Sequence, residues 1–235
     1  MAKIIKIICL ISILSIVVGL SGAELDYMSI KYKSLRNIKL VLKNDPLLVN
    51  ICDGLGRTPL HLASAEGRLA LVNLFIKAGA DVNDIDSLNG YTPLHYACFH
   101  GYVHIARFLL ARGAKVNSVD KMNNTPLHFA AGNGNLELCD LLILHGANTS
   151  LVNTYGCTPL FNSMLLGKDY QNFPYAQKGL KNYIEQAKIL SKPSWLMNLQ
   201  NCKGVTPLDN LKKSGLAKRK VNKILNEISK FIQTR

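Results

Sequence analysis

Three histidines recur at nearly equal spacing along the chain, at His61, His95 and His128. Histidine is the side chain best suited to proton transfer and metal binding near neutral pH, so these positions are the obvious candidates for chemistry. A polar residue that recurs with a sequence repeat usually marks a repeated hydrogen bond, because each copy places it in the same surroundings. We therefore predict a structural role for all three.

No other pattern in the sequence points to catalysis. The chain contains no Cys-x-x-Cys or His-Glu-x-x-His zinc spacing, no glycine-rich phosphate loop and no Gly-x-Ser-x-Gly elbow. We predict no catalytic residue, no metal site and no cofactor, and hence no enzyme. Five cysteines follow residue 23, an odd and scattered set that fits buried side chains better than disulfides: Cys52, Cys98, Cys139, Cys157 and Cys202.

The elements that position these residues are set by a repeated box. Thr-Pro-Leu recurs with spacings of 34, 33, 33 and 48 residues, starting at Thr58, Thr92, Thr125, Thr158 and Thr206. Threonine caps helices well, and proline loses nothing at the first helical position. Each box therefore predicts the start of a helix.

A second helix follows in each of the first three copies. A glycine nine residues after the threonine (Gly67, Gly101, Gly134) ends the first helix, and a Gly-Ala pair follows the second. One helix pair cannot bury its own apolar face, so neighbouring pairs must stack. Helical spacing selects these core positions: Leu69, Leu71, Val72 and Phe75; Val103, Ile105, Ala106 and Leu109; Leu136, Leu138, Cys139 and Leu142.

This pattern resembles the ankyrin repeat over residues 54–167, with weaker copies on both sides. The resemblance implies an all-α repeat solenoid of stacked helix-turn-helix repeats with β-turn or hairpin tips, in which the box histidines brace the turn before the first helix. The boundaries predicted are a capping repeat at residues 24–53, repeats at 54–87, 88–120, 121–153 and 154–201, and a C-terminal capping repeat at 202–235. The 48-residue spacing places an insert near 168–182 in the fourth repeat.

The first 23 residues have the order of a secretory signal peptide. Lys3 and Lys6 precede an apolar run from Ile7 to Leu20, and small residues end at Ala23. A retained membrane anchor is the alternative, but the run is shorter than the roughly 20 residues that span a bilayer. We predict cleavage after Ala23 and secretion of the mature chain.

Charge is distributed unevenly. The chain carries 28 Lys and Arg against 15 Asp and Glu, a net +13, which invites a nucleic-acid or anionic-membrane partner. Residues 54–167 hold seven basic and seven acidic residues, whereas residues 203–235 hold nine and two. The surplus therefore lies in the C-terminal cap. Most of its basic residues belong to the outer face of a predicted helix: Lys218, Arg219, Lys220, Lys223 and Lys230.

The resemblance also implies a binding face, because ankyrin repeats generally bind through the turn tips and first helices. Several residues at those positions are apolar where exposure is expected, and aromatic residues, Met and Arg are enriched in interface cores. The alternative is that some of them pack along the stack. The predicted protein-binding residues are Leu55, Arg57, Tyr91, Phe99, His100, Met122, Asn133, Tyr155 and Leu166.

The sequence leaves three functions open. The leading hypothesis is an exported module that binds a partner protein through the concave ankyrin face, similar to secreted ankyrin effectors of intracellular bacteria, with a host protein as one candidate partner. The alternative is binding of nucleic acid or an anionic membrane by the C-terminal lysines, which predicts a steep loss of affinity with salt. An enzyme would need a site in the insert or the caps. We expect no nucleic-acid partner, and membrane contact only through an uncleaved signal segment.

Overall fold

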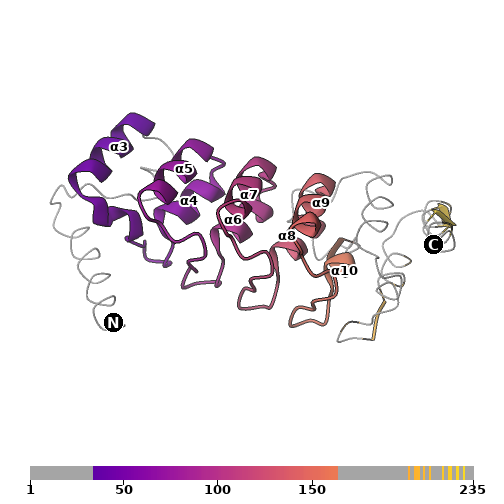
Figure 1. Ribbon diagram of the computed structural model, residues 1–235. Coiled ribbons are helices and arrows are strands. Elements are labelled where there is room, and N and C mark those ends of the chain that lie inside the picture. Colours follow the sequence, from indigo (N-terminus) through magenta and orange to yellow (C-terminus); the bar gives the residue numbers. More distant parts are fainter. Residues whose placement is uncertain are drawn as a thin grey trace.

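The computed structural model describes residues 34–163 and scattered positions between 201 and 230. Helices stack side by side in two layers, and the loops between repeats project from one edge (Figure 1). The outer layer consists of α3 (Leu35–Asn44), α5 (Leu69–Lys77), α7 (Val103–Leu110) and α9 (Leu136–Leu144). The inner layer consists of α4 (Pro59–Ala65), α6 (Pro93–Phe99), α8 (Pro126–Gly132) and α10 (Pro159–Ser163). The predicted all-α repeat solenoid is confirmed.

The inner helices begin at the predicted boxes. Thr58, Thr92 and Thr125 are the N-cap residues of α4, α6 and α8, and a proline follows each of them in the first turn. In every case the threonine side chain pairs with the backbone of the histidine three residues on, and that histidine pairs with the threonine backbone. The reciprocal pairing gives hydrogen-bond partners to backbone N–H groups at the helix start that have none within the helix.

Gly67 shows why each inner helix ends at a glycine. Its φ of 72° lies in the left-handed region that side chains disfavour. A Cβ atom at this position would also lie 2.9 Å from the ring of Tyr102 in the next repeat. Gly101 and Gly134 share the positive φ, so the predicted break in each repeat is confirmed.

One continuous core runs between the layers. Nearly all the predicted core positions of the outer helices are buried or partly buried, with Phe75, Leu109 and Leu142 fully inaccessible to solvent. Leu69, the first residue of α5, is the exception and remains 36% exposed. The N-terminal repeat joins the same core through Ile38 and Leu42 of α3 and through the short 3-10 helix η1 (Pro46–Asn50).

The projecting loops end in tight turns, which we call the fingers: residues 53–57, 86–91, 120–124 and 153–157. Each finger is closed at 3.0 Å by a backbone hydrogen bond between its first and last residues, as from Asp53 N to Arg57 O. Neighbouring fingers are also joined, with Ser87 N donating to Leu55 O and Lys121 N to Asn89 O. The second finger is one residue longer than the others, which accounts for the 34-residue spacing of the first two boxes.

Several predictions fall outside the described residues. These are the signal peptide at 1–23, the insert near 168–182, Leu166, and most of the C-terminal cap. Within the described part, no helix is long and apolar enough to cross a membrane.

Candidate functional site

The box histidines are structural braces between repeats. His61 accepts a hydrogen bond at Nδ1 from the backbone N–H of Thr58, at 3.0 Å, and its Nε2 donates to the carbonyl oxygens of Asp84 and Tyr91, each at 3.0 Å. Carbonyl oxygens only accept, so the proton of the neutral ring lies on Nε2. Both ring nitrogens are therefore engaged within the fold.

His95 and His128 repeat this geometry. Nε2 of His95 donates to Asn124 O at 3.2 Å, and Nε2 of His128 donates to Cys157 O at 3.0 Å, in each case to the next finger. Both side chains are fully buried. Burial disfavours the charged ring and lowers the pKa of each to about 4, so both are neutral at physiological pH. The predicted structural role of the histidines is confirmed.

Acidic and amide side chains brace the fingers from within, a role that the sequence analysis missed. Asp53 Oδ1 accepts from the backbone N–H groups of Leu55 and Arg57 at 2.9 and 3.0 Å. Asp86, Asp120 and Asn153 accept equivalent pairs of bonds. Their recurrence five or six residues before each box threonine was the available signal. The fingers are consequently held in one conformation.

Two rows of apolar side chains line the fingers. Seven of the eleven large hydrophobic residues that are exposed among the described residues lie here. The tip row occupies the position two residues after the bracing Asp or Asn: Leu55, Leu88, Met122 and Tyr155. The flank row occupies the position just before it: Ile85, Val119 and Val152. Residues at equivalent places on stacked repeats follow one another along the solenoid, so each set forms a row.

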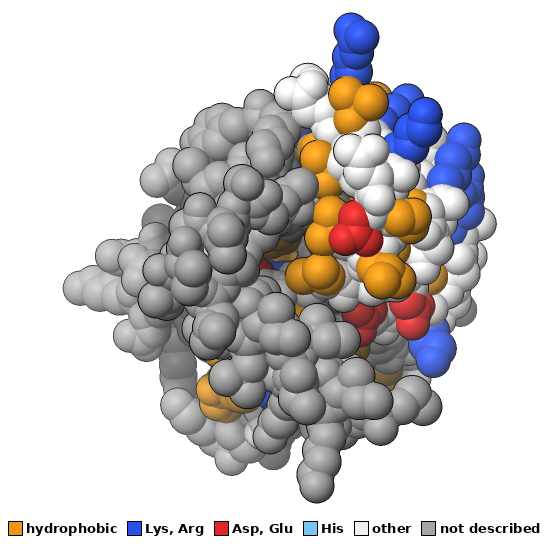
Figure 2. Space-filling model, turned by 90° about the vertical axis from the view of Figure 1, so that its left-hand side faces the viewer, with side chains coloured by type: hydrophobic (Ala, Val, Ile, Leu, Met, Phe, Trp, Pro, Cys, Tyr) orange, Lys and Arg blue, Asp and Glu red, His pale blue; other side chains and the backbone are white. Residues whose placement is uncertain are grey.

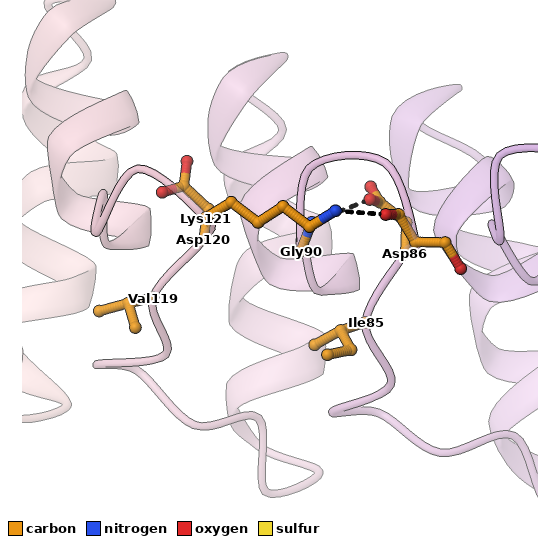
Figure 3. A pocket seen from close by; sticks show the side chains of 7 residues that line it. Ile85, Asp86, Gly90, Val119, Asp120 and Lys121 are labelled. Carbon is orange, nitrogen blue, oxygen red and sulfur yellow. Dashed lines mark hydrogen bonds between the residues drawn. The ribbon is translucent and has the colours of Figure 1, made fainter. Parts of the chain in front are cut away.

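A hollow of about 480 Å³ separates the second and third fingers. Ile85 and Val119 of the flank row lie on its wall and project to the same side (Figure 3). Lys121 crosses between the two fingers, and its Nζ donates to the carbonyl oxygens of Ser87 and Leu88 at 2.5 and 2.9 Å. Lys121 thereby fixes the longer second finger, which presents Leu88 at 54% exposure.

An aromatic cluster joins the end of the second finger to the inner helices α6 and α8. The ring of Tyr91 meets those of Phe129 and Tyr96 edge-on, with centroids 5.3 and 5.5 Å apart, and Phe99 meets Phe129 at 5.8 Å. All four side chains are partly buried. Burial raises the pKa of Tyr91 to about 12. Tyr91 and Phe99 therefore both contact the ring of Phe129 in the next repeat. Tyr96 and Phe129 are cluster members that the predicted binding residues did not include.

The remaining predicted binding residues divide between surface and interior. Leu55, Met122 and Tyr155 are exposed. Arg57 is half-buried and its guanidinium lies 2.7 Å from the carboxylate of Asp53, while His100 packs between aromatic rings and has a pKa lowered by burial.

Asn133 requires a correction. Its side chain is only 4% exposed, and its amide donates to Cys98 O and Phe99 O at 3.0 and 2.6 Å. The position follows an inner helix, where the resemblance placed binding residues, but here the amide caps the preceding repeat. Asn133 is a tie between repeats and cannot contact a partner directly.

The C-terminal basic alternative rests on the nine basic residues of 203–235, of which the structure describes Lys212, Arg219, Lys223 and Lys230, all in exposed helical positions. Among the described residues, no three His, Cys, Asp or Glu side chains are grouped so as to hold a metal ion. The fingers and the adjoining inner helices are therefore the best-defined candidate surface.

Two family models match the chain. One, described as ankyrin repeats in three copies, matches residues 27–120, and the other, described as ankyrin repeats in many copies, matches residues 104–143. The rat ankyrin repeat and SAM domain-containing protein 6 is 37% identical over 65 residues, with 28% of this chain and 7% of the relative covered. The putative ankyrin repeat protein FPV244 of fowlpox virus is 38% identical over 81 residues, with 28% of this chain and 12% of the relative covered. The chain thus spans a small part of the length of these relatives.

Proposed function

Because residues 27–143 are ankyrin repeats, which are protein–protein interaction modules, we propose that this chain binds a partner protein through the tip and flank rows of its fingers. The aromatic cluster on the inner helices forms the adjoining part of the same contact surface. Ankyrin repeats are typically non-enzymatic scaffolds, which agrees with the structural use of the histidines.

The recurrence of exposed apolar residues carries the proposal. Scattered hydrophobic side chains are ordinary on a protein surface, but a contiguous exposed patch marks an interaction site. In the tip row, each of the four fingers presents an apolar residue, whereas the similar turn at 201–205 has Lys203 at that position in the sequence. None of the four apolar side chains is needed to close its own finger, because the bracing Asp or Asn does so. Contact with a partner protein explains why these exposed positions at the finger tips carry apolar side chains.

The fingers are also preorganised for binding. Side-chain bonds from the bracing residues fix each finger, and backbone bonds such as Thr154 N to Met122 O, at 2.9 Å, join it to its neighbour. A surface that is already ordered loses less conformational entropy when a partner binds. The rows therefore suit a partner that spans several repeats.

We further propose that the protein is exported and acts as an effector on a host protein. The basic, apolar and small-residue order of residues 1–23 supports export. No disulfide joins the cysteines of the described residues, and Cys98 is fully buried with its pKa raised by burial. Such cysteines suit a protein whose destination is a reducing compartment, such as the cytosol of another cell.

Comparative affinity capture tests the proposal. The bait is the secreted wild-type chain, and the test variant combines Leu55→Ser, Leu88→Ser, Met122→Ser and Tyr155→Ser. The matched control combines Leu47→Ser and Leu144→Ser, whose side chains are 78% and 83% exposed away from the fingers. We expect a host protein that wild type and control retain and the finger variant loses. Equal retention by all three baits, with all three folded by circular dichroism, would place the binding surface elsewhere.

A further inference from the structure

The exposed side of α3 has an unusual composition. The helix contains no acidic residue, and its exposed side chains include Arg36, Lys39, Leu40 and Lys43. At 3.6 residues per turn these four side chains fall within an arc of roughly 100°, opposite the buried Ile38 and Leu42. We call these four residues the α3 face.

The polarity of the α3 face is inverted relative to the other repeats. Superposing Val49-Asn50 on Val82-Asn83 and Val116-Asn117 aligns α3 with α5, α7 and α9. All three cations then stand where the other repeats have apolar residues, and Leu40 stands where they have polar ones. Arg36 corresponds to Leu69, Val103 and Leu136, Lys39 to Val72, Ala106 and Cys139, Lys43 to Ile76, Leu110 and Ile143, and Leu40 to Asn73, Arg107 and Asp140.

Capping alone does not account for this composition. A terminal repeat needs a polar outer face for solubility, and acidic or uncharged side chains would provide it equally well. Here the polar residues that replace apolar ones are all cations, and Leu40 is 54% exposed among them although solubility gains nothing from it. Residues 27–44 contain five Lys or Arg and no Asp or Glu. Leu47, in the adjoining η1, adds a second leucine at 78% exposure.

The arrangement of charge is visible at the N-terminal end of the stack. Figure 2 faces that end, and most of the Lys and Arg side chains in view gather along one margin, with hydrophobic side chains beside them. The nearest described acidic residue in sequence, Asp45, has a carboxylate oxygen that accepts a hydrogen bond from Leu47 N at 3.1 Å. The α3 face itself carries three cations and no acidic residue, with the exposed Leu40 among them.

We infer that the α3 face binds an anionic lipid surface. The lysines and arginine attract the acidic headgroups, and Leu40 and Leu47 enter the apolar boundary beneath them, as on an interfacial amphipathic helix. The contact uses the end of the solenoid and leaves the fingers available, so it is independent of the proposed protein binding.

Vesicle co-sedimentation of the full chain tests this inference. Vesicles of phosphatidylcholine and phosphatidylserine in equal amounts are compared with vesicles of phosphatidylcholine alone. At about 1 kcal/mol for each basic residue near the surface, reversing Arg36, Lys39 and Lys43 to Glu is expected to weaken binding to the anionic vesicles at least 100-fold. The matched control reverses Lys77, Arg112 and Lys115, which are exposed on other repeats, and is expected to keep most of the binding.

Two further arms identify the ligand and the site. Leu40→Ser is expected to weaken vesicle binding about fivefold, since it removes an apolar side chain from the lipid boundary, and to leave retention on duplex DNA unchanged. Equal binding to both kinds of vesicle would overturn the inference, as would equal losses for the α3 and control reversals. Unchanged vesicle binding by Leu40→Ser, with displacement by duplex DNA, would instead indicate a general polyanion site. Loss of binding only when Lys218, Arg219 and Lys220 are reversed would move the site to the C-terminus.

Discussion

Replacing His95 by alanine removes a buried link between two repeats. The ring accepts from Thr92 N at 3.1 Å and donates to Asn124 O at 3.2 Å, and its side chain is fully buried. The substitution leaves the N–H group of Thr92 and the carbonyl oxygen of Asn124 without their hydrogen-bond partner. Each buried group left without a partner costs about 1–3 kcal/mol of stability. We expect the free energy of unfolding to fall by about 3 kcal/mol, after allowing for water entering the vacated space. Urea denaturation followed by circular dichroism measures this change.

The same variant should alter the pH dependence of stability. Burial lowers the pKa of His95 and of His128 from 6.5 to about 4 in the folded chain. The unfolded chain therefore binds more protons between pH 6.5 and pH 4, so the stability that these rings contribute is present above pH 6.5 and is lost as the pH falls towards 4. One unit of pKa corresponds to about 1.4 kcal/mol, so each histidine accounts for up to about 3 kcal/mol over this window. His95→Ala should have a shallower decline than the wild type.

His104 provides the control, because it is an exposed histidine outside the boxes. His104→Ala should change the free energy of unfolding by less than about 0.5 kcal/mol. An unchanged melting temperature for His95→Ala would refute the structural role of His95, as would a pH dependence of stability identical to that of the wild type. His95 would then again be a candidate catalytic or metal-binding residue.

Other predictions test the core, a turn and the N-terminus. Leu109→Ala, in the fully buried core, should reduce the free energy of unfolding by about 2–5 kcal/mol through transfer and cavity terms, whereas Leu144→Ala should change it little; similar melting temperatures would contradict the assigned core. Gly67→Ala should destabilise the fold by more than about 1–2 kcal/mol, because it adds a clash with Tyr102 to the left-handed strain. Gly132→Ala, with open space around its Cβ position, is the matched control, and equal effects would argue against the close approach. N-terminal sequencing of exported material should begin at Glu24, and Met1 on membrane-bound material would establish an anchor instead.

Periodicity predicted the fold because helix caps, helix ends and core positions are decided locally. Thr92, Pro93 and His95 form their capping box within four consecutive residues, so one copy of the motif contains nearly all the information. Buried positions such as Phe75 and Leu142 follow from helical spacing for the same reason. Leu69 departs from the pattern, whereas Val103 and Leu136 at the equivalent positions are partly buried.

The surface was harder to predict because it depends on contacts between repeats. Asn133 resembles an exposed residue at the end of an inner helix, yet its amide reaches the carbonyl oxygens of Cys98 and Phe99 in the preceding repeat. Tyr91 and Phe99 contact Phe129, which lies 38 and 30 residues away from them along the chain. By contrast, Leu55, Met122 and Tyr155 were selected correctly as exposed, since the finger position alone determines which way they point.

Site-specific photocrosslinking tests the central claim that the fingers contact a partner protein. A photoreactive amino acid is placed at Met122, in the tip row, and separately at Leu144, which is 83% exposed at the end of α9. Each variant is irradiated in a lysate of the candidate host cell. We predict a discrete crosslinked protein from position 122, lost when Leu88 and Tyr155 are changed to Ser, and none from position 144. The same crosslink from position 144, or none from position 122 in folded protein, would contradict the claim.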